Sequence, residues 1–176
     1  MRPPSSRSCT TGAKAGSDEE RSHYHGRVPY FICPNCKERS IDSDGRTSLI
    51  DPTAVGCSRC GFGFLFELME DYYPAPTTGF VVCDRSGRVL AVGRGVFELT
   101  GYTEGTLMGA DVETALALDG SDEDQSPVRI ALEWGVRKLD QELELETASG
   151  ARKAVMVDLF PAYDDDGGLL VALTPR

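Results

Sequence analysis

The pattern of apolar and polar positions divides the chain into three stretches. Residues 1–26 contain almost no large apolar side chain and are rich in Ser, Arg, Gly and Pro, which predicts a disordered tail. Short apolar runs separated by turn residues follow, as is typical of a small β unit. Val28–Ile32 predicts its first strand, Thr47–Ile50 is a candidate for the second, and Phe62–Phe66 predicts the last.

The end of this small unit has a helical pattern. Apolar residues separated by three and four positions lie on one face of a helix. The residues with this spacing are Leu65, Leu68, Met69 and Tyr72. Because Pro74 and Pro76 cannot continue a helix, we predict a helical connector at residues 67–76. The apolar segment Phe62–Tyr73 has two interpretations: it packs the small unit onto the next domain, or it forms a homodimer interface.

From residue 77 onward, runs with a period of two alternate with helical stretches. Strands are predicted at Phe80–Asp84, Val89–Val92 and Leu139–Glu146, through Val155, Val157 and Leu159, and at Leu169–Leu173. Helices are predicted at Gly95–Tyr102, after Thr103, and after Ser126, where a Ser cap precedes Pro127 at the first helical position. This mixture of elements predicts an α+β domain.

The first half of this domain carries a longer motif. A D-x-x-G-R turn at Asp84–Arg88 joins the first two strands, and Phe97–Gly109 contains F-E-L-T-G-Y-T-x-x-x-L-M-G. This combination resembles a PAS domain, although Arg94 stands where that family usually has Asn. The resemblance covers residues 77–176. It implies a five-stranded antiparallel sheet with flanking helices, and a sensory or interaction module.

The strongest chemical signal is a pair of C-x-x-C motifs. Cys33 and Cys36 form the first, and Cys57 and Cys60 form the second after twenty intervening residues. A tight turn brings both sulfurs of each motif to one side, so two motifs can complete a tetrahedral thiolate site. We therefore predict one structural Zn²⁺ per chain, held by these four cysteines in a β-rich zinc ribbon at residues 27–66. Four thiolates leave no open position for catalysis.

Two other uses of these cysteines fit less well. A redox C-x-x-C pair begins a helix in a thioredoxin-like βαβ unit, which this sequence lacks. A disulfide framework belongs to a secreted chain. Cys9 and Cys83 have no partner pattern; we expect Cys83 to be a buried structural thiol, with a redox-sensing thiol as the alternative. His23 and His25 are expected to be solvated.

Charge and hydropathy narrow the classes of partner. The chain has a net charge of −10, and residues 72–176 carry nine basic and eighteen acidic side chains. Nucleic-acid binding needs a basic stripe, which the sequence does not have. Apolar runs are far shorter than the ~20 residues of a membrane span. Met1–Ser17 lacks the apolar core of a signal peptide. We expect a cytoplasmic protein with no membrane or nucleic-acid partner.

The cofactor of the second domain cannot be read from the motif. PAS domains can hold a ligand between the sheet and the helices. No histidine follows His25, which excludes a haem with an axial His from this domain. The N-C-R-F-L-Q motif of flavin-binding members is absent, because the matching positions Gly109–Thr114 are G-A-D-V-E-T. The PAS ligand is therefore unknown. Trp134 is expected to be a packing or pocket-wall residue.

No Ser–His–Asp set, P-loop or dinucleotide motif is present, so we do not expect an enzyme. We expect a sensory or regulatory adaptor: the PAS domain senses a ligand or partner, and the ribbon supports protein–protein contacts. A homodimer would form through Phe62–Tyr73 or the PAS sheet. One alternative is a transcription-associated zinc-ribbon protein that binds nucleic acid and dimerises through its PAS domain. The other is a cysteine and zinc redox switch.

Overall fold

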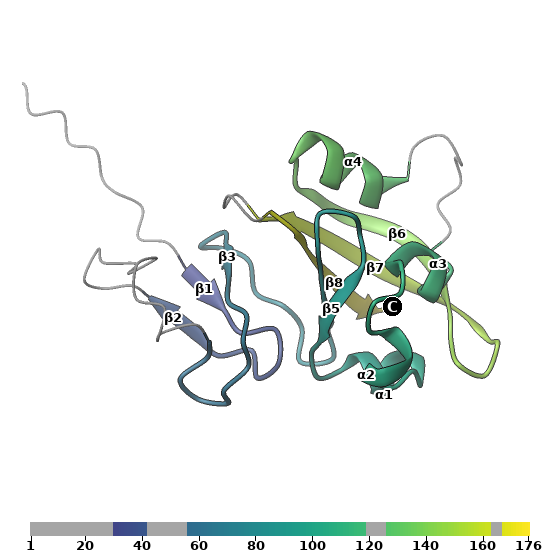
Figure 1. Ribbon diagram of the computed structural model, residues 1–176, viewed down its shortest axis with the longest axis horizontal. Helices are drawn as coiled ribbons and strands as arrows, with labels where there is room; N and C mark the ends of the chain where they lie inside the picture. The colour runs from purple at the N-terminus through teal and green to yellow at the C-terminus, as the bar shows by residue number, and fades with distance from the viewer. Residues whose placement is uncertain (1–29, 42–55, 119–125, 163–166) are drawn as a thin grey trace, which may run out of the picture.

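The computed structural model describes residues 30–41, 56–118, 126–162 and 167–176. They form two antiparallel sheets that lie side by side, with short helices around the larger sheet (Figure 1). The fold class is therefore α+β, as predicted. The expected tail, the candidate strand Thr47–Ile50, Cys9 and the two histidines lie outside the described residues.

The small sheet contains three strands of three residues. They are β1 (Tyr30–Ile32), β2 (Arg39–Ile41) and β3 (Phe66–Leu68). β1 lies in the centre and pairs with both neighbours in an antiparallel register. Strands this short have few ladder hydrogen bonds, so a sheet of this size needs additional support from packing or a metal.

Two predictions about this unit were wrong. Its last strand begins at Phe66 rather than ending there, and residues 69–78 form turns instead of the predicted helix. Phe66 and Leu68 are buried and Glu67 is exposed, and this period of two matches a strand rather than a helix. The edge strand β2, Arg39–Ile41, has a mostly polar sequence and was not predicted.

The large sheet has five strands in the order β5-β4-β8-β7-β6. Their bounds are β4 (Gly79–Cys83), β5 (Val89–Val92), β6 (Lys138–Glu146), β7 (Arg152–Pro161) and β8 (Leu169–Pro175). All neighbouring strands are antiparallel. The predicted five-stranded sheet is confirmed, and the first and last of its strands in sequence, β4 and β8, pair in its interior.

Four short helices accompany this sheet among the described residues. They are α1 (Val96–Thr100), α2 (Glu104–Leu107), α3 (Val112–Leu116) and α4 (Pro127–Trp134). Ser126 caps α4 as predicted, because its Oγ accepts a hydrogen bond from the Arg129 N–H at 3.3 Å. Helix α3 was not predicted. Its sequence signal is Asp111, whose carboxylate accepts from the Thr114 N–H at 2.9 Å.

The inner face of the large sheet packs against the helices. The cluster there is almost entirely aliphatic and includes Val81, Val96, Leu107, Leu116, Leu145, Val157, Leu159 and Leu173. Trp134 does not belong to it: this residue ends α4 beyond the buried Val128 and Ala131 and is 76% exposed. The prediction that Trp134 lines a pocket or a core was wrong.

The outer face of the large sheet packs against the small sheet. Six of its residues are buried there: Phe80, Val82, Ala91, Phe160, Leu170 and Ala172. Ile32, Phe66 and Leu68 of the small sheet complete the same cluster, and Phe62, Phe64 and Tyr72 lie against it. This confirms that the apolar segment around residues 62–72 packs the small unit onto the next domain. No helix within the described residues is long and apolar enough to cross a bilayer.

Candidate metal centre

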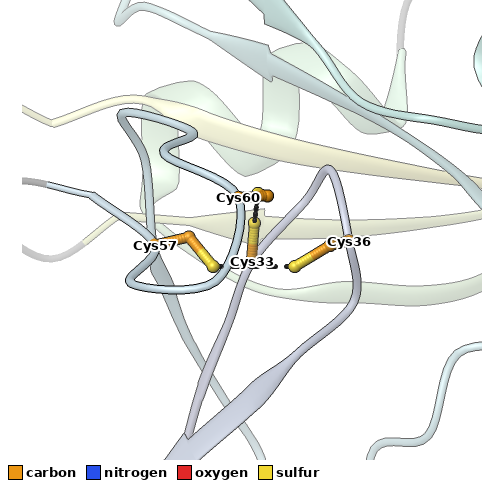
Figure 2. Close-up of side chains that lie close together, drawn as sticks. All are labelled: Cys33, Cys36, Cys57 and Cys60. Carbon is orange, nitrogen blue, oxygen red and sulfur yellow. Dashed lines mark hydrogen bonds between the residues drawn. The ribbon is translucent and has the colours of Figure 1, made fainter.

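The four predicted ligands converge in the structure. Their sulfurs all lie within 4.8 Å of one another, and those of Cys33 and Cys60, like those of Cys36 and Cys57, are 3.6 Å apart (Figure 2). A tetrahedral ion with Zn–S bonds of about 2.3 Å would hold its sulfurs about 3.8 Å apart. The donor set and its spacing therefore fit a tetrahedral metal ion.

Each cysteine pair lies on the same kind of turn. The carbonyl oxygen of Cys33 accepts the N–H of Lys37 at 2.9 Å, and that of Cys57 accepts the N–H of Gly61 at 2.8 Å. Both turns pass through a left-handed residue, Lys37 with φ 59° and Gly61 with φ 73°. Glycine adopts this conformation without strain, whereas Lys37 is held there by a second bond, because its ammonium donates to the Pro76 carbonyl.

The cluster has a buried side and an exposed side. Cys33 and Cys57 are buried, Cys36 is intermediate and Cys60 is exposed. In the thiol form, burial raises the pKa of Cys33 to about 12. The backbone N–H of Phe62 lowers the pKa of Cys60 to about 7. The Asn35 amide also donates to the Cys60 sulfur at 3.6 Å. Because Cys60 is exposed, solvent reaches the site through the second turn.

The first turn rests directly on the large sheet. Pro34, between Cys33 and Cys36, is buried, and its carbonyl oxygen faces the end of β5. A Cβ atom added at Gly93 would lie only 2.2 Å from that oxygen, closer than any atom can approach without displacement. Gly93 also donates its N–H to the Phe80 carbonyl at 2.8 Å. This role of Gly93 was not predicted, because only the tertiary structure places Gly93 beside Pro34.

The segment after β3 is attached to both sheets. The Tyr72 hydroxyl donates to Asp158 Oδ2 on β7 at 2.8 Å, and its ring meets Phe160 edge-on at 4.7 Å between centroids. The nearly buried Asp158 also accepts the Asp140 N–H at 2.8 Å. Burial, followed by the neighbouring Asp158 charge, raises the pKa of Tyr72. Without Tyr72, the Asp158 carboxylate would lose one of its two hydrogen-bond donors named here.

A cation–π stack holds the other side of this segment. The Arg39 guanidinium on β2 lies 4.7 Å from the centroid of the Tyr30 ring and 4.2 Å from that of Tyr73. The same guanidinium donates to the Glu70 carbonyl at 3.0 Å. Tyr72 and Tyr73 therefore contact different sheets, which fixes the connector between them.

Comparison with known proteins identifies the second domain. A family model described as "PAS domain" matches residues 77–174, more than half of the chain. The chain belongs to the PAS domain family. No curated protein matches it. The predicted PAS resemblance is confirmed, and the four-cysteine ribbon lies before the matched residues.

Several solved structures are similar to this chain at low sequence identity. A variant of Vivid is 16% identical, with a TM-score of 0.50, and the match covers 62% of this chain and 84% of that one. The PAS domain of a Colwellia psychrerythraea protein is 20% identical, with a TM-score of 0.48 and coverage of 57% and 86%. That of nitrogen regulation protein NR(II) from Vibrio parahaemolyticus is 14% identical, with a TM-score of 0.44 and coverage of 57% and 91%.

Tyr72→Phe tests the attachment of the connector to the PAS sheet. The substitution keeps the ring on Phe160 but leaves Asp158 without its hydroxyl donor. Because hydrogen bonds to charged groups contribute about 1.5–3 kcal/mol, we expect the free energy of unfolding to fall by about 1.5 kcal/mol in urea titrations. Tyr73→Phe is the matched control, since Tyr73 is 73% exposed. Equal losses in both variants would contradict this assignment.

Cys83 lies apart from the metal centre, on β4 of the PAS sheet. It is 1% exposed, as predicted for a structural thiol, and burial raises its pKa to about 12 from 9.0. Its contribution to stability is present below pH 9 and is lost as the pH rises toward 12. We expect N-ethylmaleimide to modify Cys83 only after denaturation, as measured by peptide mapping. Rapid modification of the folded chain would revive the redox-sensing alternative.

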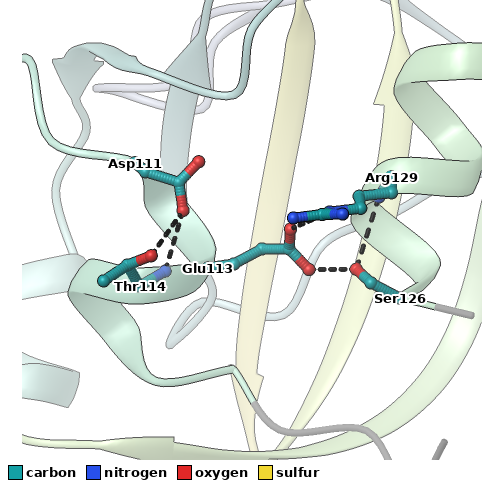
Figure 3. A network of polar contacts seen from close by, with 5 residues as sticks. All are labelled: Asp111, Glu113, Thr114, Ser126 and Arg129. Atoms are coloured by element: carbon teal, nitrogen blue, oxygen red, sulfur yellow. Dashed lines mark hydrogen bonds and ion pairs between the residues drawn. The ribbon is translucent and has the colours of Figure 1, made fainter. Parts of the chain in front are cut away.

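A polar network on the helical side serves as a structural support. Glu113 accepts from the Ser126 hydroxyl and lies 3.7 Å from the Arg129 Nε, so it ties α3 to the start of α4 (Figure 3). Asp111 accepts from the Thr114 N–H and hydroxyl, each at 2.9 Å. A pocket of about 250 Å³ lies beside these residues. Two acidic side chains that line it, Asp111 and Glu113, already have partners that cap or join helices.

Proposed function

We propose that this chain is a non-enzymatic regulatory adaptor in which the PAS domain senses a ligand or partner and the zinc ribbon presents the result to another protein. The observation that carries this proposal is the apolar cluster shared by the ribbon and the outer face of the PAS sheet. Ribbon and sheet have a common core, so a change in one alters the packing of the other.

Strands β4 and β8 provide the physical link. Alternate residues of a strand point to opposite faces, so Val81 packs toward the helices while Phe80 and Val82 pack toward the ribbon. In β8, Val171 packs toward the helices and Leu170 packs toward the ribbon. A ligand that displaces these strands from the helical side therefore changes the surface on which the ribbon rests.

The input site is proposed to lie between the sheet and the helices. The side chains there are aliphatic, with Leu107, Leu116, Leu145 and Leu159 each at most 1% exposed. This lining suits a small apolar molecule better than a charged one, because a buried charge needs partners. A protein partner that binds the helices would act on the same strands without entering the core.

The ribbon is proposed to hold one structural Zn²⁺ per chain. Four thiolates at tetrahedral spacing are the ligands that Zn²⁺ prefers, and they leave no open coordination position for a reaction. Cysteines that bind a metal must not be oxidised to disulfides, and a reducing compartment keeps them in this form. We therefore propose a cytoplasmic location. The net charge of −10 favours a protein partner over nucleic acid.

Native mass spectrometry of the full chain, purified without denaturation, tests this function. We expect one zinc per chain, and hydrogen exchange at Tyr30–Ile32 and Phe66–Leu68 that changes when a bound small molecule is removed. A zinc-loaded chain with no adduct assigns the input to a protein partner. Identical assembly and identical ribbon exchange with and without the adduct would contradict the proposal.

A further inference from the structure

The outer face of the PAS sheet is apolar and is buried by the ribbon. Its six core residues are at most 6% exposed, and the side chains that cover them come from β1, β3 and the connector. The residues of the face are Phe80, Val82, Ala91, Phe160, Leu170 and Ala172. Whatever removes the ribbon therefore uncovers an apolar surface on a folded sheet, together with the Asp158 carboxylate, which lies on the same face beside Ala172.

The position of this cover depends on the metal ligands. Ile32, which enters the shared cluster, directly precedes Cys33, and the buried Pro34 directly follows it. The ribbon sheet has only three residues per strand. Units of this size rarely fold alone, and in such cases the free energy of metal binding is the free energy of folding. Loss of the metal thus removes the constraint that places Ile32 on the sheet.

We propose that metal occupancy controls access to this face: the metal-loaded chain keeps it covered, and the metal-free chain pairs it with the same face of a second copy. The inference rests on the proposed function in that it uses the same surface, and it names the metal itself as a regulator of assembly. The PAS sheet keeps its own inner core in both states, because the ribbon contributes no residue to that cluster.

Beyond the ribbon, the outer face carries a charged rim formed by Glu142, Glu144, Arg152 and Arg176. This rim favours a second copy of the chain as the partner that covers the face. Glu142 pairs with Arg176 at 2.7 Å, and Glu144 pairs with Arg152 at 3.4 Å. Leu143 and Leu145 of β6, Val155 of β7 and Leu173 of β8 point inward, so by alternation all four charged side chains lie on the outer face. The rim has two positive and two negative groups. They lie together on one side of the apolar residues, and across a two-fold axis each charge can meet its opposite there.

The test compares the full chain before and after removal of its metal by a chelator, under reducing conditions that prevent disulfides. Size-exclusion chromatography with light scattering gives the mass, and the fluorescence of an apolar-surface dye reports the open face at low protein concentration. We expect chelation to raise the dye signal and, at higher concentration, to double the mass. Zn²⁺ should restore both values, whereas Mg²⁺ should not, because it does not select thiolates.

Charge reversal at the rim identifies the surface. Arg176→Glu replaces the positive partner of Glu142 with a carboxylate, which then faces the acidic side chains of the second copy. Because like charges across an interface are unfavourable, we expect the dissociation constant of the metal-free dimer to rise about tenfold. The matched control is Arg129→Glu, an exposed arginine on α4, on the helical side. It should leave the dimer unchanged. Both variants should bind zinc normally, because neither residue contacts the cysteines.

Several outcomes would overturn the proposal. An unchanged mass and dye signal after chelation would mean that the ribbon does not need metal to cover the face. A raised dye signal without a doubled mass would exclude a second copy as the occupant. Open-ended aggregation, or equal weakening by both charge reversals, would place the contact elsewhere. None of these results affects the ligand-dependent ribbon exchange of the zinc-loaded chain, which tests the proposed function separately.

Discussion

Cys33→Ala is expected to abolish stoichiometric metal binding and to unfold the ribbon while the PAS domain stays folded. Cys33 is the fully buried ligand, and it lies between Ile32 and Pro34, both of which are buried. Structural zinc contributes about 10–16 kcal/mol to the folding of small metal-binding units, far more than three-residue strands can replace. Loss of one thiolate therefore removes most of the stabilisation of the ribbon.

Metal analysis and hydrogen exchange measure this result. The zinc content should fall well below one per chain, and amides of β1 and β3 should lose protection while those of β7 and β8 keep it. Cys83→Ala is the matched control, because it removes a buried thiol that does not belong to the cluster. A Cys33→Ala chain that keeps one tightly bound zinc and a protected β1 would contradict the metal assignment.

Gly93→Val is expected to separate the ribbon from the PAS sheet without loss of metal. Even the first side-chain atom at this position would lie 2.2 Å from the Pro34 carbonyl oxygen and 2.8 Å from its carbonyl carbon. Backbone atoms of a tight turn cannot move aside as a flexible side chain would. Overpacking typically costs about 1–3 kcal/mol, and we expect about 3 kcal/mol here because both opposing atoms belong to the backbone.

Calorimetry should then resolve two unfolding transitions where the parent chain has one, and zinc content should remain at one per chain. Gly63→Val is the matched control: Gly63 lies in the ribbon, and a Cβ added there has no atom within 4 Å. A single transition at the parent temperature in Gly93→Val would show that the turn does not dock on β5.

Local patterns were sufficient to predict most strands and the cluster of four cysteines. Val89–Val92 was predicted with its observed bounds, and the alternation of Val155, Val157 and Leu159 placed their side chains in the inner core. The spacing of the four cysteines predicted their convergence, because two short turns restrict where the sulfurs can lie. These features depend on residues close in sequence, which is why the sequence alone specifies them.

Features that depend on distant residues were not predictable. Tyr72 and Asp158 are 86 positions apart, and Gly93 meets Pro34 only after both sheets have formed. The helical spacing around Leu68 was overruled by pairing with β1 and by burial on the PAS sheet. Trp134 was misassigned, since its size favours burial but the buried stripe of α4 ends before it.

The pairing of β4 with β8 in the interior of the sheet has a consequence for synthesis on the ribosome. The ribbon is translated first, whereas β8 (Leu169–Pro175) supplies two residues of the face that receives it and is translated last. The ribbon therefore leaves the ribosome before its docking surface is complete, and the proposed metal can bind it at that stage. If the ribbon folds on binding this metal, as proposed, metal supply during translation affects how much ribbon is folded and ready to dock when β8 is completed.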